Sequence, residues 1–240
     1  MNTYLIANWK MHGHRAQVQD YAFRVNAALS SAPKHLITVF CPPANYIDAA
    51  SQALPLNARL TIGAQNCHTH ASGAYTGEIA VPMLADCGAL AVIVGHSERR
   101  TYFAETDALV EQKARAVAAA GLTPIVCIGE SLEEYEAGKT AAVLEKQLEA
   151  YAAQPIDGML VAYEPVWAIG SGKTPSGAEI AAAHAKIKSM LGSAISVLYG
   201  GSVKPANLAE ILEIEGVNGA LIGGASLDAA GMIEMIATVK

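Results

Sequence analysis

No cluster of basic residues occurs in this 240-residue chain, in which Arg99-Arg100 is the sole adjacent basic pair and the net charge is −6. Binding to nucleic acid depends on repeated contacts of lysine and arginine with phosphates, so the composition argues against it. No apolar run approaches the ~20 residues that a helix needs to cross a bilayer. The start of the chain also lacks the charged and apolar regions of a secretory signal. We therefore expect a cytoplasmic enzyme or binding protein.

The chain also lacks any C-x-x-C pair among its four cysteines, which are Cys41, Cys67, Cys87 and Cys127. This usage is typical of buried free thiols in a reducing compartment. His68 and His70 lie close to Cys67, but no carboxylate stands at ligand spacing from them. We therefore predict no metal site there.

Short apolar runs alternate with amphipathic stretches along the whole chain. The runs are typical of parallel strands buried on both faces, and the stretches are typical of helices. We expect strands at residues 4–8, 36–41, 60–65, 91–94, 124–128, 159–163, 195–199 and 219–222. We expect helices at residues 15–31, 107–120 and 140–153, and one that runs to Leu191 from a capping box at Ser176 and Glu179. Ser131 and Glu134 repeat the capping-box signature.

No linker rich in proline or serine divides this pattern, so we predict one domain over residues 1–240. About eight right-handed β-α units either close into a (β/α)8 barrel or form an open doubly wound sheet. The first strand is not followed by G-x-G-x-x-G, which weakens the open, dinucleotide-binding alternative. We therefore predict the α/β class and a (β/α)8 barrel of eight parallel strands.

Polar residues and glycines follow six of the predicted strands. Because active sites of such barrels lie at the carboxyl ends of the strands, these residues are the candidates for chemistry. Taken singly, each has a simpler interpretation: a solvated lysine, a structural histidine, a surface ion pair or a plain glycine turn. Their shared position after strands argues against that interpretation. They are Asn8, Lys10, His96, Ser97, Glu98, Cys127, Glu130, Glu164, Gly200, Gly201, Ser202, Gly223 and Gly224.

Glu164 ends an apolar strand and precedes a glycine-rich segment bracketed by Pro165 and Pro175. This arrangement indicates a base on a rigid element, followed by a loop that can cover a small anion. Glycine lets a backbone approach a ligand closely, so N–H groups after the last two strands, with Ser202 and Gly170, can form an anion nest. No Walker P-loop is present, which favours a phosphorylated metabolite over a nucleotide.

Five motifs in order resemble the triosephosphate isomerase family over essentially the whole chain. They are Asn8-Trp9-Lys10; Val94-Gly95-His96-Ser97-Glu98-Arg99-Arg100; Cys127-Ile128-Gly129-Glu130; Tyr163-Glu164-Pro165-Val166-Trp167-Ala168-Ile169-Gly170; and Tyr199-Gly200-Gly201-Ser202-Val203 with Gly223-Gly224-Ala225-Ser226-Leu227. The resemblance implies a TIM barrel that interconverts dihydroxyacetone phosphate and glyceraldehyde 3-phosphate without a cofactor or metal, a step of glycolysis and gluconeogenesis.

The resemblance also implies roles for the catalytic side chains. Glu164 is then the base that moves a proton between C1 and C2, and Lys10, positioned with the help of Asn8, neutralises negative charge on substrate and enediolate. His96 polarises the carbonyl as a neutral imidazole. It stands at the start of a helical turn, whose positive end disfavours its protonation.

Further implied roles concern the phosphate, the supporting residues and a lid. Gly170, Ser202, Gly223 and Gly224 hold the phosphate through backbone N–H groups, while Ser97, Glu98 and Cys127 support the site. A lid that grips the phosphate excludes water and prevents elimination of phosphate from the enediol. The lid residues are Pro165, Val166, Trp167, Ala168, Ile169, Gly170, Ser171, Gly172, Lys173 and Thr174.

The family resemblance further implies a homodimer through loops around residues 11–13 and 73–78. Thr76 in the second loop would support Asn8 and Lys10 of the partner subunit. His12 stands where the family commonly has Asn, so the sequence departs from the family at this interface. Ser171 replaces the usual Thr, and Pro175 restricts Thr174 to extended geometry.

Two other classes of function stay open at this point. Another phosphosugar isomerase or a Schiff-base aldolase could use the same fold, although an aldolase would want a lysine inside a strand and Lys10 follows one. A phosphate-metabolite binder without catalysis is the alternative from another class. The presence of Lys10, His96 and Glu164 together argues against it.

Overall fold

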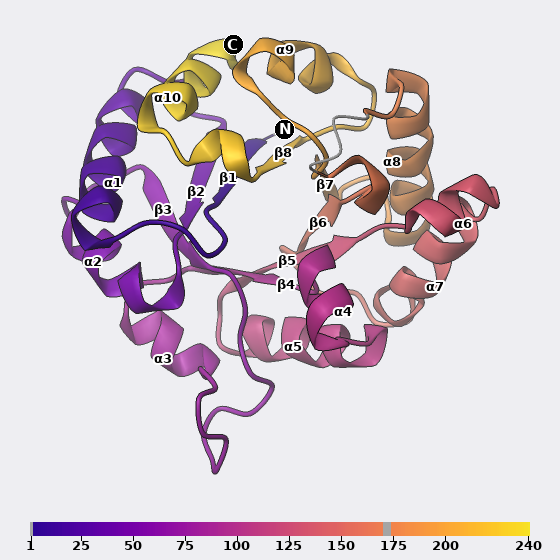
Figure 1. The fold of residues 1–240 in the computed structure, drawn as a ribbon, viewed down its shortest axis with the longest axis horizontal. Helices are drawn as coiled ribbons and strands as arrows, with labels where there is room; N and C mark the ends of the chain where they lie inside the picture. Colours follow the sequence, from indigo (N-terminus) through magenta and orange to yellow (C-terminus); the bar gives the residue numbers. More distant parts are fainter. Residues whose placement is uncertain (1, 170–173) are drawn as a thin grey trace.

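The computed structural model describes residues 2–169 and 174–240. Eight parallel strands close into a barrel in chain order, from β1 beside β2 round to β8 beside β1 (Figure 1). The strands are β1 (Thr3–Asn8), β2 (Leu36–Cys41), β3 (Leu60–Ala64), β4 (Ala91–Val94), β5 (Thr123–Ile128), β6 (Leu160–Tyr163), β7 (Ser196–Tyr199) and β8 (Gly219–Ile222). This confirms the predicted (β/α)8 barrel.

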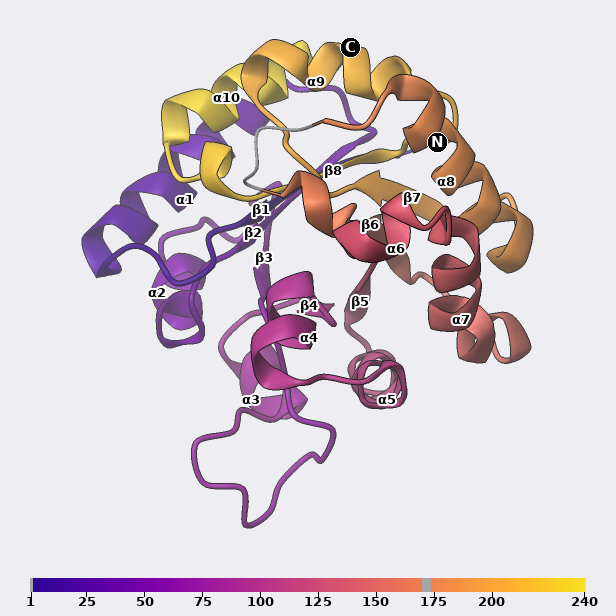
Figure 2. The same cartoon turned by 45° about the vertical axis from the view of Figure 1, so that its right-hand side comes forward.

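Helices surround the barrel on its outer side (Figures 1 and 2). The α-helices are α1 (Arg15–Leu29), α2 (Ile47–Gln52), α3 (Val81–Asp86), α4 (Ser97–Phe103), α5 (Asp107–Ala119), α6 (Leu132–Glu136), α7 (Thr140–Ala153), α8 (Gly177–Leu191), α9 (Pro205–Glu213) and α10 (Ala229–Thr238). The described residues also form the short 3-10 helices η1 (Ala44–Tyr46), η2 (Val166–Ala168) and η3 (Gly224–Ser226). The capping boxes predicted at Ser131 and Ser176 are both present.

Most predicted boundaries agree with the structure to within one residue. The prediction for helix 140–153 is confirmed, and α5 ends one residue before the predicted end. The predicted helix 15–31 is wrong at its end, because α1 stops at Leu29. There the guanidinium of Arg59 donates to the main-chain oxygens of Leu29 and Ala32, which are thereby satisfied without a further helical turn.

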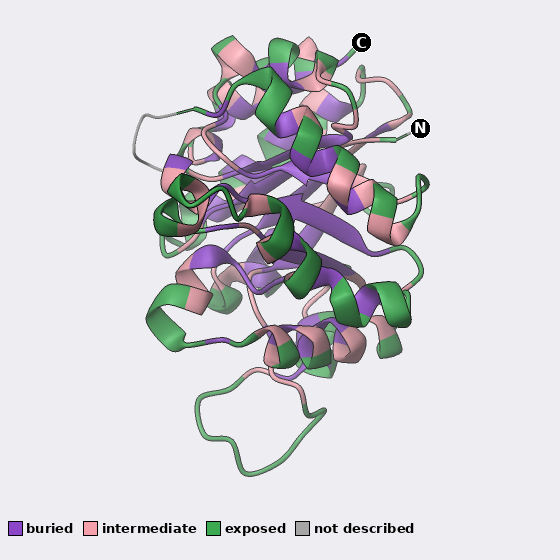
Figure 3. Ribbon diagram, turned by 90° about the vertical axis from the view of Figure 1, so that its right-hand side faces the viewer, coloured by how far each residue is buried: buried purple, intermediate pink, exposed green. Residues whose placement is uncertain are grey.

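Each strand is apolar on both faces because the barrel has two apolar layers. Ile6 points into the barrel interior, while its neighbours Leu5 and Ala7 join the cluster between strands and helices. The interior cluster consists of Ile6, Val39, Cys41, Ala91, Ile93, Ile125, Cys127, Leu160, Ala162, Leu198 and Leu221. Figure 3 shows the strands buried and the outer helix faces exposed. The burial of both faces explains why the strands lack polar and apolar alternation.

A long loop between β3 and α3 projects away from the barrel (Figures 1 and 3). At its base, the N–H of His68 donates to the main-chain oxygen of Ile79 at 2.8 Å. Within the loop, the ring centroid of His68 lies 4.2 Å from that of Tyr75, and His70 stacks on the same tyrosine with 4.9 Å between centroids. Residues 70–78 are all exposed. The loop therefore has internal order but little contact with the rest of its own chain.

Candidate active site

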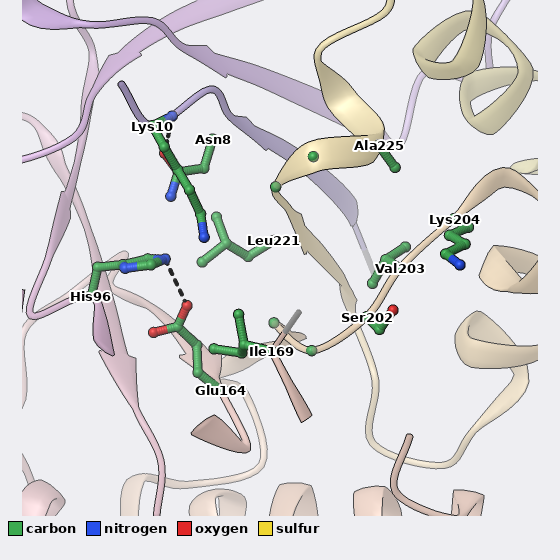
Figure 4. A pocket seen from close by; sticks show the side chains of 14 residues that line it. Asn8, Lys10, His96, Glu164, Ile169, Ser202, Val203, Lys204, Leu221 and Ala225 are labelled. Carbon is green, nitrogen blue, oxygen red and sulfur yellow. Dashed lines mark hydrogen bonds and ion pairs between the residues drawn. The ribbon is translucent and has the colours of Figure 1, made fainter. Parts of the chain in front are cut away.

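The carboxyl ends of the strands surround one cavity of about 250 Å³. It brings together most of the residues that the sequence singled out, from β1, β4, β6, β7 and β8 (Figure 4). Its lining residues are Asn8, Lys10, His96, Glu164, Ile169, Gly200, Gly201, Ser202, Val203, Lys204, Leu221, Gly223, Gly224 and Ala225. The structure therefore brings these residues together at the rim where the sequence predicts a site.

Glu164 follows β6 directly, and its carboxylate is nearly inaccessible, with 2% of the residue exposed. One carboxylate oxygen lies 3.0 Å from Nε2 of His96, and the other accepts the main-chain N–H of Ser97 at 2.9 Å. Burial raises the pKa of Glu164, but the neighbouring His96, the Ser97 N–H and Lys10 outweigh it and hold the pKa below its ordinary value. A buried carboxylate is thus kept ionised at the rim.

His96 is the N-cap residue of α4 and is also buried. Its Nδ1 accepts the main-chain N–H of Glu98 at 3.2 Å, so a neutral ring carries its proton on Nε2, facing Glu164. Figure 4 shows the two side chains facing each other across the cavity floor. Burial lowers the pKa of His96, but the charge and hydrogen bond of Glu164 outweigh burial and raise it. The carboxylate of Glu164 thus sets the direction of the pKa shift of His96, which is opposite to the direction expected from the helix end alone.

Lys10 reaches over the same cavity from the loop after β1 (Figure 4). Its Nζ lies 2.6 Å from a carboxylate oxygen of Glu98, and its main-chain N–H donates to Oδ1 of Asn8 at 3.1 Å. Its backbone φ is +52°, a left-handed conformation that non-glycine residues adopt at a cost of ~1–3 kcal/mol. The surroundings thus impose a specific backbone on the residue that carries the ammonium group.

The opposite wall of the cavity is mostly backbone. Gly223 and Gly224 follow β8, and η3 begins at Gly224. A β-carbon on Gly223 would stand 3.4 Å from Cε of Lys10, and one on Gly200 would stand 2.8 Å from Cγ of Glu164. Side chains at these positions would fill the cavity or displace the carboxylate. The glycines therefore keep open a space, bounded by peptide groups, that faces Lys10.

Two predicted supporting residues contact the central groups directly. Ser97 donates its main-chain N–H to Glu164, and Glu98 pairs with Lys10. Cys127 is buried in the barrel interior, and burial, together with the nearby carboxylate of Glu164, raises the pKa of its thiol well above the ordinary value. An uncharged thiol is a poor nucleophile, so Cys127 contributes to the packing of the barrel interior.

Other predicted residues lie away from the cavity or outside the described residues. Thr76 is exposed in the projecting loop and does not line this cavity. Among the predicted lid residues, Pro165 is buried, Val166, Trp167 and Ala168 form η2, and Ile169 lines the cavity. Thr174 is exposed. Gly170, Ser171, Gly172 and Lys173 lie outside the described residues.

Several residues that line the cavity were not predicted from the sequence. Val203, Lys204, Leu221 and Ala225 line the cavity, and the sequence assigned none of them a role. Arg100 is part of the adjacent basic pair Arg99-Arg100, and its guanidinium donates to the main-chain oxygens of Gly95 and Cys127 and to Asp107. No spacing rule links these positions, so no local signal marked them. Within residues 2–169 and 174–240, no group of three or more His, Cys, Asp or Glu side chains is arranged to hold a metal ion.

A buried ionised carboxylate, an imidazole with its proton on Nε2 and an ammonium group share one small cavity at the carboxyl rim of the barrel. The fold and site define a class: (β/α)8-barrel proteins equipped for acid–base chemistry on a small metabolite.

Comparison with known proteins narrows this class. The sequence profile of the triosephosphate isomerase family matches residues 3–239. Triosephosphate isomerase from Bradyrhizobium diazoefficiens is 47% identical over 238 residues, which cover 95% of this chain and 94% of the relative. The enzyme of that name from Bordetella pertussis is 46% identical over 240 residues, with 97% and 96% covered. The crystal structure of triosephosphate isomerase from Bartonella henselae superposes with a TM-score of 0.90 at 37% identity, covering 99% of both chains. The chain belongs to the triosephosphate isomerase family.

Proposed function

We propose that this chain is an isomerase that interconverts dihydroxyacetone phosphate and D-glyceraldehyde 3-phosphate through an enediolate. The observation that carries the proposal is the shared cavity of Glu164, His96 and Lys10, in a chain that belongs to the family throughout its length. The α-proton of a hydroxyketone is a weak acid, so its removal needs a close base and electrostatic stabilisation of the enediolate. The three side chains supply both.

Glu164 is proposed to move the proton between C1 and C2. Its carboxylate lies 3.0 Å from Nε2 of His96, and the N–H on that nitrogen is the donor that would polarise the substrate carbonyl. Substrate binding therefore requires the carboxylate to leave His96 for the C–H group. Once it leaves, the cause that raises the pKa of His96 weakens, and burial then favours the neutral imidazole. Lys10, positioned with Asn8, is proposed to neutralise the enediolate and the phosphate.

The phosphate is proposed to lie against the glycine wall. Ser202, Gly223 and Gly224 line that part of the cavity, and Gly170 is the fourth member of the proposed phosphate site. Residues 165–174 are proposed to act as the lid, with Ile169 on the cavity side. Ser97, Glu98 and Cys127 are proposed to support the site from behind.

A homodimer is proposed through loops around residues 11–13 and 73–78. Met11 is 93% exposed, and the projecting loop makes few contacts with its own chain. A second hollow of about 610 Å³ adjoins Lys10 and is lined by Met11, Asn66, Tyr102 and Phe103 among others. Its size and partly apolar lining suit a loop from a second copy, with Thr76 of the partner subunit near Asn8 and Lys10. Sedimentation as a monomer at micromolar concentration would contradict this.

One domain over residues 1–240 and a cytoplasmic location complete the proposal. Among residues 2–169 and 174–240, no helix has both the length and the apolar content that a membrane crossing requires.

The decisive experiment is a steady-state assay of glyceraldehyde 3-phosphate conversion with a chelator present. We expect kcat/KM of ~10⁷–10⁸ M⁻¹s⁻¹ and a loss of at least ~10³-fold in Glu164→Gln. A folded protein that binds inorganic phosphate without turnover would favour the binder. Borohydride trapping of a lysine adduct with substrate would favour the aldolase.

A further inference from the structure

Tyr135 on α6 contacts both flanks of the segment that joins β6 to α8. Its ring stacks on that of Trp167 in η2, with 4.1 Å between centroids and an interplanar angle of 25°. Its hydroxyl donates to Oε1 of Glu179 in the first turn of α8 at 2.5 Å. A single side chain thus links two elements that lie on either side of residues 170–173 in the sequence.

On the α8 side, the hydrogen bond reaches the residue that fixes the start of the helix. Glu179 accepts from the main-chain N–H and the hydroxyl of Ser176, both at 2.7 Å, in the capping box of α8. The hydrogen bond from Tyr135, followed by those from Ser176, lowers the pKa of Glu179 and so favours the ionised carboxylate. Tyr135 therefore contacts the side chain that orients the first residues after the segment.

On the β6 side, Trp167 is held from two directions. Its indole Nε1 donates to Oε1 of Glu130 at 2.9 Å, while its face receives the ring of Tyr135. The main-chain N–H of Val166 also donates to the main-chain oxygen of Glu130 at 3.1 Å. Ile169, two residues after Trp167, lines the catalytic cavity. The placement of the indole consequently affects how a cavity residue enters the site.

The helix that carries Tyr135 is itself fixed. In its capping box, Glu134 accepts the N–H of Ser131 at 2.8 Å, and the N–H of Glu134 donates to the Ser131 hydroxyl at 3.2 Å. The main-chain N–H of Tyr135 donates to the oxygen of Ser131 at 2.9 Å. A ring mounted on a capped turn can set positions in its neighbours, because its own backbone is determined.

We propose that Tyr135 is a positioning residue for the isomerase site, which sets residues 165–169 and the start of α8 in register with each other. The inference rests on the proposed function. It adds a residue from outside the cavity, which touches neither the proposed base nor the phosphate wall. Its two contacts are separable: the stack acts on Trp167, and the hydroxyl acts on Glu179.

The test compares Tyr135→Phe, Tyr135→Leu and the control Phe23→Leu. Phe23 lies on α1, is 64% exposed and lines no part of the catalytic cavity. Thermal melting checks that each variant is folded. The chain has two tryptophans, and Trp9 is fully buried, so a change in emission on altering Tyr135 reports the environment of Trp167. Isomerase kinetics and the inhibition or binding constant of inorganic phosphate are then measured.

We expect Tyr135→Phe to keep the emission and lower kcat/KM by about threefold, through the lost contact with Glu179. Tyr135→Leu should shift the emission, lower kcat/KM by about tenfold and weaken phosphate binding by a similar factor. Phe23→Leu should match the wild type. A folded Tyr135→Leu variant with wild-type kinetics and phosphate binding would overturn the proposal. If the wild type itself has no isomerase activity, the proposed function fails, and the ratio of phosphate affinities still decides the role of Tyr135.

Discussion

Gly129 lies against the backbone of Glu164 so closely that a β-carbon on Gly129 would stand 1.8 Å from the main-chain oxygen of Glu164. The contact joins the ends of β5 and β6, where the N–H of Glu164 also donates to the oxygen of Ile128 at 2.7 Å. The proposed base therefore has its backbone position fixed by the absence of a side chain on the neighbouring strand.

Gly129→Ala should displace Glu164 and lower kcat/KM by at least about a hundredfold, because misplacement of a reacting group by ~1 Å has effects of that size. Overpacking should also lower the free energy of unfolding by ~1–3 kcal/mol. Steady-state kinetics and urea denaturation measure the two effects. Gly177→Ala is the control, since a β-carbon there meets its nearest atoms at 3.7 Å. Equal activity in both variants would show that the base tolerates the shift.

Gln147 on α7 holds Gly129 from behind. Its side chain accepts the main-chain N–H of Gly129 at 2.8 Å and donates to its main-chain oxygen at 3.1 Å. Gln147→Met should leave both peptide groups without these partners, destabilise the protein by ~2–4 kcal/mol and reduce kcat about tenfold. Chemical denaturation and kinetics test this. If the variant is destabilised as expected but its kcat is unchanged, Gln147 has a structural role alone.

Glu164 controls the titration of His96. Burial lowers the pKa of His96, and the charge and hydrogen bond of Glu164 are the next largest causes, both of which raise it. Glu164→Gln removes the charge at nearly constant volume, so the pKa of His96 should fall below its ordinary value of 6.5. Titration of the imidazole resonances by NMR measures this in wild type and variant. An unchanged pKa would show that another group sets the titration.

His184 in α8 should make stability depend on pH. It is fully buried, and its Nδ1 lies 3.2 Å from the main-chain oxygen of Gly216. Burial lowers its pKa from 6.5 to about 4, with the Gly216 contact opposing and Lys188 assisting. The unfolded chain therefore binds the proton more readily, so this contribution is complete above pH 6.5 and is lost as the pH falls toward 4, by about 3 kcal/mol.

The measurement is the urea midpoint of wild type and His184→Gln between pH 4 and pH 8. Other groups titrate in both proteins, so the difference between the two curves isolates His184. The variant should lose less stability on acidification than the wild type. Parallel curves would show that His184 is not buried as a neutral ring.

Features that depend on residues close together in the chain could be predicted from the sequence. The capping boxes at Ser131 and Ser176 each involve residues three positions apart, and the structure contains both. The end of α1 was predicted two residues too late; at Leu29 the main-chain oxygen accepts a hydrogen bond from Arg59, which lies 30 residues further along the chain. Long-range contacts of this kind leave no trace in a spacing pattern.

In the candidate site, too, some features could be predicted from the sequence and others depend on long-range contacts. Lys10, His96 and Glu164 follow strands, so topology alone predicted that they would meet. The pKa of His96 depends on a carboxylate 3.0 Å away in space and 68 residues away in sequence, and the local helix end suggested the opposite direction. Gln147 and Tyr135 act through contacts between separate elements, and no motif marks either.

Because the backbone of Lys10 is left-handed, stability and catalysis favour different residues at position 10. Glycine adopts a φ of +52° without strain, so replacement of Lys10 by glycine should relieve strain while removing the ammonium group. Laboratory evolution for heat resistance alone should therefore drift toward glycine at this position, whereas growth that depends on turnover should retain lysine. The residue found at position 10 thus shows whether a population of variants has been selected for thermal stability or for catalysis.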